Sequence, residues 1–498
     1  MSRLFTYIKP AFYLAFTLVL SACLTGPDNV TTSQAASAAI SDDSLPEQTN
    51  EVDQTEPEDN SFFYFSYDDS ASTASRDLTF FAIEQGTQPS ISWGRPYEYL
   101  NAESLGHFSS THAAGPFEVS IGAYQSSASE LVLEDSEDNF LSLGINLTGP
   151  TIDKSARKNL VLTLLVDTSG SMNTEFSRNY ESVDGVKTRL DVVQYGLQEL
   201  YDALKPGDVV NLVEFNSSAN TLVEDWRYEE GGNEQSYLAM VDELRANNST
   251  NLDAGIQLAY TVANRVYDET KANRVILLTD AFVNTGVTDS SVIAEHTVIN
   301  GLEGIYLSGI GVGFGFNDDF LNELTDIGKG SYSAMITPED AKRLFSEQFM
   351  RFIDHAVEGV RFKLDYPQSW QHLVSAAEET SQQQNDVRTI NFAYNSEQFF
   401  FEVFSSSDAF ENEQSLQLVI QYKEDGQSQE ATVDVNLNEI LDQGIDNIKA
   451  AGAVNTLANL VAQSISCQQL EDSDFNSLNS SHTVWQKYID AIQSYCSY

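Results

Sequence analysis

Two patterns of apolar residues alternate over residues 157–353: continuous apolar runs, and apolar residues at steps of three or four. Residues 161–166 are Val or Leu except for Thr163, and residues 274–279 contain a second apolar run, Val275–Leu278. Unbroken runs of this kind are typical of strands that are buried on both faces of a parallel sheet. Between them, residues 187–204 carry apolar side chains at steps of three or four, which predicts an amphipathic helix. The pattern therefore predicts an α/β fold, a doubly wound and mostly parallel sheet over residues 157–353.

The same patterns predict the other elements of this region. Strands are expected at residues 209–215 and 304–312, and helices at residues 235–245, 253–267, 290–300, 318–327 and 338–353.

The segments on either side of this region differ from it. Residues 60–150 contain an aromatic strand-like run at 62–67, a helix pattern at 74–84 and strand patterns at 117–124 and 141–147, which predicts a small N-terminal α+β or β unit. Residues 357–436 read as a β-rich domain, and residues 438–498 return to a helical pattern. The strands of the β-rich domain are expected at 360–364, 388–392, 399–404, 415–422 and 430–435.

The N-terminus has the composition of a targeting segment. Arg3 and Lys9 precede about ten apolar residues that are too few to span a bilayer, so residues 1–22 predict a signal peptide. The tetrapeptide Leu20-Ser21-Ala22-Cys23 resembles a bacterial lipobox, and this resemblance implies a lipid on Cys23. By the same resemblance, Leu24 after the cysteine permits sorting to the outer membrane, which is favoured over the inner membrane. An ordinary secretory signal with a chance cysteine is the alternative, and both predict an extracytoplasmic protein. Residues 23–59 are rich in polar and acidic residues, which predicts a disordered linker.

The charge balance narrows the classes of partner. The 498 residues include 26 Lys and Arg against 74 Asp and Glu, so the net charge is −48. Nucleic-acid binding needs clustered Lys and Arg side chains, so the sequence predicts that this protein does not bind nucleic acid. Most of this charge is expected to be a solvated surface, with an acidic binding face as the alternative.

Three cysteines are present. If Cys23 carries lipid, Cys467 and Cys496 remain in an oxidising compartment, and a disulfide between them is favoured over two free thiols.

Oxygen-bearing side chains follow the two buried strands. Asp167, Ser169 and Ser171 form a D-x-S-x-S loop directly after the first strand, and Asp280 follows the second. Thr250 stands in a polar turn before a helix pattern. Ligand sites of open α/β sheets lie at the carboxyl ends of the strands, so these groups are expected to meet. An oxygen-only set suits a hard cation, with Mg²⁺ first and Mn²⁺ or Ca²⁺ possible. Neutral hydroxyl ligands leave the ion positive, which favours an Asp or Glu of a protein partner as a further ligand.

These five residues, in this order, resemble the metal-ion-dependent adhesion site of von Willebrand factor type A domains. The resemblance implies direct metal contacts from Ser169, Ser171 and Thr250, with Asp167 and Asp280 close behind, and reversible binding of protein ligands. This chain departs from the family where small glycines often precede the Thr (here Asn248 and Ser249) and where Gly often follows the last Asp (here Ala281). Its long flanks resemble bacterial lipoproteins that carry such a domain between an N-terminal associated domain and a C-terminal extension.

The leading hypothesis is a lipid-anchored envelope protein that binds a protein partner through the cation and is not an enzyme. One alternative is an envelope structural or assembly factor whose ion is purely structural. The other is a metal-dependent hydrolase, which needs a general base near the ion. The six His residues are scattered, and no G-x-S-x-G or H-E-x-x-H motif is present.

Overall fold

A computed structural model describes residues 60–67, 72–134, 136–176, 185–284, 286, 304–424 and 426–497. The predicted signal peptide, Cys23, the linker to residue 59 and the helix expected at 290–300 lie outside these described residues. All described residues belong to one compact unit, Glu58–Tyr498.

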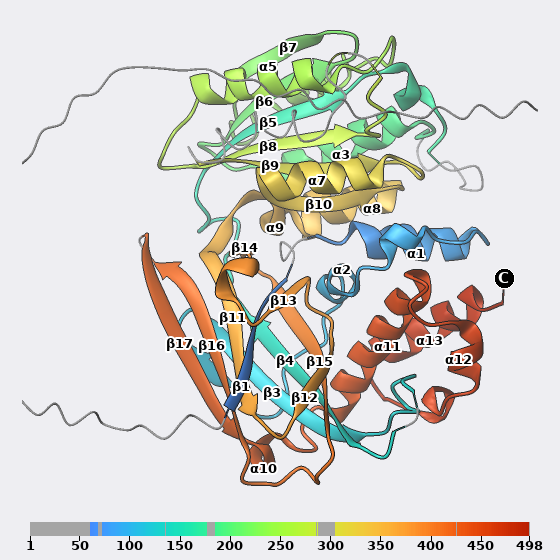
Figure 1. Cartoon of the computed structure of the whole chain (residues 1–498). Helices are drawn as coiled ribbons and strands as arrows, with labels where there is room; N and C mark the ends of the chain where they lie inside the picture. The colour runs from blue at the N-terminus through green and yellow to red at the C-terminus, as the bar shows by residue number, and fades with distance from the viewer. Residues whose placement is uncertain are drawn as a thin grey trace, which may run out of the picture. The chain divides into compact units, whose positions relative to one another are not determined.

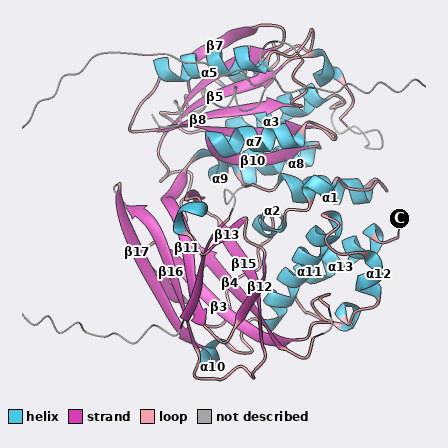
Figure 2. Cartoon of the chain, viewed as in Figure 1, coloured by secondary structure: helices cyan, strands magenta, loops and turns pink. Residues whose placement is uncertain are grey.

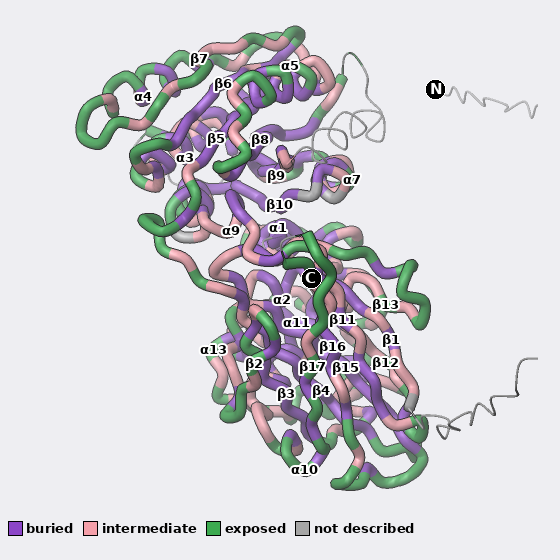
Figure 3. The backbone as a smooth tube through the Cα atoms, turned by 90° about the vertical axis from the view of Figure 1, so that its left-hand side faces the viewer, coloured by how far each residue is buried: buried purple, intermediate pink, exposed green. Residues whose placement is uncertain are grey.

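The region 157–353 forms the predicted α/β fold. Its sheet has the strand order β10-β9-β8-β5-β6-β7, and all neighbours are parallel except the antiparallel edge strand β7. The central strands are buried along their whole length, which is why they read as unbroken apolar runs (Figure 3). Strand β7 was not predicted, because its edge position leaves most of its residues partly or fully exposed. The strands are β5 (Leu160–Asp167), β6 (Val209–Phe215), β7 (Ala219–Arg227), β8 (Ala272–Thr279), β9 (Ile305–Val312) and β10 (Lys329–Met335).

Helices cover both faces of this sheet (Figure 1). On one face, α5 (Leu252–Arg265) and α7 (Asp318–Gly328) pack against the strands. On the other face lie α3 (Arg189–Ala203), α4 (Glu234–Val241), α8 (Pro338–Lys342) and α9 (Phe349–Ile353). The single helix predicted over 338–353 is instead divided by a π-helical turn at Arg343–Glu347.

Two further sheets pack face to face around a second core (Figure 2). One sheet has the order β13-β1-β11-β16-β17 with β14 beside β11, and the other has the order β12-β15-β4-β3-β2. The first contains β1 (Asn60–Ser66), β11 (His355–Pro367), β13 (Glu379–Ser381), β14 (Ile390–Ala393), β16 (Ser415–Glu424) and β17 (Gln427–Asn436). The second contains β2 (His112–Ala114), β3 (Phe117–Ser126), β4 (Asn139–Thr148), β12 (Gln371–Ser375) and β15 (Glu397–Ser406).

The segments predicted as two separate units, residues 60–150 and 357–436, share these sheets. Strand β1 pairs with β11 over Asn60–Phe65, and β4 pairs with β15 over its full length. The physical reason is burial: Phe63 and Phe65 of β1 reach a core that Phe362 and Phe400 of the later segment complete. Each segment supplies strands to both sheets, and neither sheet is complete without the other segment.

Helices from both ends of the chain pack together beside the second sheet. Helix α11 lies on β3, β4 and β15, and it also contacts α2 and α13. Cys467 and Cys496 form a disulfide with their Cα atoms 5.6 Å apart, which joins α12 to the end of α13. These helices are α1 (Ala74–Glu84), α2 (Pro96–Asn101), α11 (Ile445–Val461), α12 (Cys467–Glu471) and α13 (Thr483–Tyr495). The short helix α10 (Leu437–Ile440) instead contacts β17 and β3. Within the described ranges, no helix is long and apolar enough to cross a bilayer.

Ion pairs around the buried Asp77 connect the N-terminal helix α1 to the α/β region. The carboxylate of Asp77 receives hydrogen bonds from Arg76 and from Arg343 of the π-helical turn, both at 2.9 Å. Arg343 also reaches Asp340 at 3.1 Å. The two guanidinium groups lower the pKa of Asp77 against the effect of burial, which acts in the opposite direction.

Candidate metal centre

The D-x-S-x-S loop leaves the carboxyl end of the central strand β5. Asp167 is the last residue of that strand, and its Oδ1 accepts a hydrogen bond from the backbone N–H of Ser169 at 2.8 Å. The hydroxyl oxygens of Ser169 and Ser171 lie 3.0 Å apart. The loop thus folds back on itself and brings three of the predicted residues together.

The loop that carries Thr250 is fastened to the first loop through the backbone. Asn247 N–H donates to the carbonyl of Thr168 at 2.8 Å, and Gly170 N–H donates to the carbonyl of Asn248 at 2.9 Å. Thr250 follows two residues after Asn248 and is 1% exposed. The turn that precedes α5 is therefore held over the end of β5.

The third loop follows strand β8 and is fastened to the other two. The hydroxyl of Thr279 donates to Oδ2 of Asp167 at 2.6 Å. Asn284 and Thr250 exchange two hydrogen bonds, one from the Thr250 N–H at 2.9 Å and one to its carbonyl at 3.2 Å. Asp280 stands between these anchors. Loops from three separate parts of the chain thus converge, as the strand ends of a parallel sheet require.

Burial gives this site its electrostatic character. Asp167 and Asp280 are each 0% exposed. Burial and then the neighbouring Asp280 raise the pKa of Asp167 to about 6, although hydrogen bonds from Thr279 and Ser169 act in the opposite direction. A carboxylate that is buried beside another carboxylate is costly unless a cation compensates for its charge.

The donor set fits a hard divalent cation. Two ligands that are adjacent in an octahedral Mg²⁺ shell, at about 2.1 Å from the ion, stand about 3 Å from each other. The 3.0 Å spacing of the Ser169 and Ser171 oxygens matches this geometry. Ser169, Ser171 and Thr250 could bind the ion directly, with Asp167 and Asp280 close behind. Of the five residues only Ser171 is partly exposed, so solvent reaches the centre on its side.

Sequence reasoning missed Thr279 and Arg189. The Arg189 side chain is 9% exposed, and its Nη1 lies 2.5 Å from Oδ2 of Asp280, while Nη2 donates to the carbonyl of Phe314 at 3.0 Å. Its Cζ also lies 5.8 Å from the ring centre of Phe282, which is 43% exposed. Arg189 is 22 positions beyond Asp167 and begins α3, so no local motif signals its place.

Two of the three departures from the family pattern, Asn248 and Ala281, occur where the backbone is unusual. Asn248 has φ +64° and Ala281 has φ +56°, both in the left-handed region that favours glycine. Asparagine tolerates this region better than other side chains do, whereas alanine is strained there. The chain therefore adopts a glycine-like backbone at Ala281 without a glycine.

No other group of metal ligands is found in the part of the chain that the structure describes. There, no three His, Cys, Asp or Glu side chains gather as a metal site would require. The candidate metal centre is not a cluster of this kind, because it combines only two carboxylates with three hydroxyl groups.

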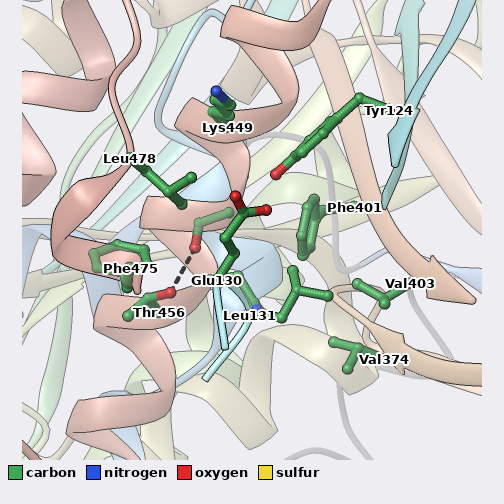
Figure 4. Close-up of a pocket in the computed structure, with 12 residues that line it drawn as sticks. Tyr124, Glu130, Leu131, Val374, Phe401, Val403, Lys449, Thr456, Phe475 and Leu478 are labelled. Carbon is green, nitrogen blue, oxygen red and sulfur yellow. Dashed lines mark hydrogen bonds between the residues drawn. The ribbon is translucent and has the colours of Figure 1, made fainter. Parts of the chain in front are cut away.

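A small cavity lies elsewhere, between α11 and the second sheet of the sandwich (Figure 4). Its volume is about 30 Å³, which is room for about two water molecules. Glu130, Lys449 and Tyr124 lie together at one end, and the unpaired Oδ1 of Asn455 is buried in its lining. The cavity shares no residue with the candidate metal centre.

Residues 162–282 match the family described as von Willebrand factor type A domain. The matched range begins in β5 and ends just after Asp280, so it contains all five predicted site residues. Domains of this family generally act in protein interactions or adhesion rather than as enzymes.

Similar proteins were found in bacteria. The chain is 26% identical over 210 residues to "Uncharacterized protein YfbK" of Escherichia coli (strain K12), a match that covers 42% of this chain and 34% of that protein. It is 23% identical over 250 residues to "Uncharacterized protein sll0103" of Synechocystis sp. (strain ATCC 27184 / PCC 6803 / Kazusa), covering 50% and 55%. The matches thus span about a third and about half of these relatives. Among solved structures, "von Willebrand factor type A from Catenulispora acidiphila" aligns with TM-score 0.42 and 12% identity, over 74% of this chain and 91% of that one.

Proposed function

We propose that this chain, which carries a von Willebrand factor type A domain, binds a protein partner through a divalent cation at Asp167, Ser169, Ser171, Thr250 and Asp280. A carboxylate of the partner completes the coordination of the ion, which we expect to be Mg²⁺. The observation that carries this proposal is the convergence of three hydrogen-bonded loops on one oxygen-rich centre, with the two serine oxygens at the spacing of adjacent Mg²⁺ ligands.

A binding role is favoured because the chemistry of the centre suits ligation better than turnover. The titratable side chains among the five residues are two carboxylates that an ion would occupy. The partly exposed Ser171 marks the side from which a partner's oxygen atom could reach the ion. When bound, the ion would supply positive charge for that oxygen, while the protein loops fix where the ion sits.

The second part of the proposal concerns location. The lipobox-like residues before Cys23 support a lipid anchor, with residues 23–59 as the linker to the folded unit. The protein would then act outside the cytoplasm, at the outer membrane more readily than at the inner. Mass spectrometry of the purified N-terminal peptide tests this directly: a diacylglyceryl group on Cys23 supports the anchor, and an unmodified Cys23 contradicts it.

Partner capture tests the binding role. The full-length chain in detergent is immobilised and exposed to envelope extract in Mg²⁺ or in EDTA, beside an Asp167→Ala variant. Asp202→Ala is the matched control, because Asp202 is exposed near the end of α3 and away from the centre. We expect one protein to be retained by wild type and by the control in Mg²⁺ only, and lost with Asp167→Ala.

The competing hypothesis is that the ion only stabilises the fold and binds no partner. It predicts that EDTA and Asp167→Ala lower the melting temperature while every retained protein stays bound. That result would contradict the binding proposal and leave the chain as an envelope structural factor.

A further inference from the structure

Arg189 places a positive charge inside the candidate metal centre. Its guanidinium holds Oδ2 of Asp280 at 2.5 Å and is fixed from the other side by the carbonyl of Phe314. Gly313, with φ +76°, makes room for this side chain, because a Cβ there would lie 2.6 Å from Nε of Arg189. The arginine is therefore built into the centre rather than resting on its surface.

The charge of Arg189 changes how the centre handles ions. A guanidinium stays protonated at any physiological pH, so it compensates for one of the two carboxylates. With a divalent ion bound, the centre then keeps a net positive charge, whereas two uncompensated carboxylates would cancel it. Such charges act strongly on each other in a buried site, where water screens them little.

Position matters as well as charge. The Asp280 oxygen that faces Arg189 is engaged by a short, charge-assisted hydrogen bond. This bond competes with direct metal ligation by the same oxygen.

From these contacts we infer that Arg189 is a positioning residue that holds Asp280 back from the ion, weakens cation binding and strengthens the binding of an anionic ligand to the loaded centre. The inference rests on the proposed function, since it needs an ion at this centre. By this effect, Arg189 favours partners that present a carboxylate over partners that present a neutral oxygen.

The test uses Mn²⁺ and acetate with the full-length chain in detergent. Free Mn²⁺ is measured by electron paramagnetic resonance, and acetate binding to the loaded centre by the loss of water-proton relaxation as acetate replaces a water on Mn²⁺. Arg189→Gln removes the positive charge and keeps an amide that can donate hydrogen bonds. In this variant we expect the Kd for Mn²⁺ to fall and the Kd for acetate to rise, each by about tenfold or more. Coulomb's law predicts a change of this size for one charge near a partly buried ion.

Two further variants separate charge from geometry. Arg189→Lys keeps the charge and should stay within a few-fold of wild type, and Arg189→Gln combined with Asp280→Asn should return the Mn²⁺ affinity toward wild type. Arg227→Gln, at an exposed arginine of β7, is the control and should change neither constant. A purely structural role would move both constants in the same direction through loss of fold.

The outcomes distinguish this inference from the proposed function. If wild type binds Mn²⁺ and Arg189→Gln binds it equally or more weakly, with unchanged circular dichroism, the role of Arg189 is refuted and the metal centre stands. If neither chain binds Mn²⁺, both the inference and the proposed function are refuted.

Discussion

Asp167 should make the metal-free protein lose stability as the pH rises. Its pKa is raised from 3.8 to about 6 by burial and by the neighbouring Asp280, so the folded protein holds this proton more tightly than the unfolded chain does. Well below pH 4 both states are protonated and the group contributes nothing. Above about pH 6 both are ionised, and the charged Asp167 is less favourable in the folded protein. Ionising Asp167 therefore costs the folded protein about 3 kcal/mol relative to the unfolded chain.

The assay is urea unfolding of wild type and Asp167→Asn in EDTA, from pH 4 to pH 7.5. The free energy of unfolding of wild type should fall by about 2.5 kcal/mol relative to the variant between pH 4 and pH 7. Saturating Mg²⁺ should abolish this relative fall, because the ion compensates for the carboxylate and displaces the proton.

Asp318 provides the matched control for this experiment. Burial raises its pKa to about 6 as well, but its partners are Arg95 and Tyr332, and the candidate centre does not include it. Asp318→Asn should therefore change the pH dependence equally in EDTA and in Mg²⁺. The reasoning about Asp167 is refuted if the difference between wild type and Asp167→Asn stays constant across the pH range in EDTA.

Three further changes test other parts of the structure. Ala281→Gly should raise the free energy of unfolding in EDTA by about 1 kcal/mol, because glycine relieves the left-handed backbone; a decrease in urea unfolding experiments would show that the turn is not strained. Asp77→Asn should lower the melting temperature and cost about 3 kcal/mol in urea unfolding, since it leaves the partly buried Arg343 short of the buried carboxylate of Asp77; a loss below about 0.5 kcal/mol would mean that Asp340 suffices. Replacing Cys467 and Cys496 by Ser should cost about 3 to 4 kcal/mol, because the bond closes a segment with a sequence separation of 29, and reduced wild type should match the double variant by the same measure.

The sequence determined the α/β region because its signals are local. The apolar runs within 161–166 and 275–278 can only be satisfied by strands that are covered on both sides, and their flanking helices carry matching apolar stripes. The site signals are local too, since each predicted residue directly follows a strand or precedes a helix. That is why Asp167, Ser169, Ser171, Thr250 and Asp280 could be selected before any contact between their loops was known.

Only the tertiary structure decided what joins distant segments. β1 pairs with β11, and β4 pairs with β15, although the paired strands are more than 200 residues apart in the sequence. The apolar pattern of a strand does not specify which distant strand it will pair with. Arg189 and Thr279 lie beside the candidate centre for the same reason: ordinary helix and strand positions gain their role from where α3 begins and β8 ends in space. The sequence thus set which groups could bind an ion, and the packing of helices against the sheet set the charge that such an ion would meet.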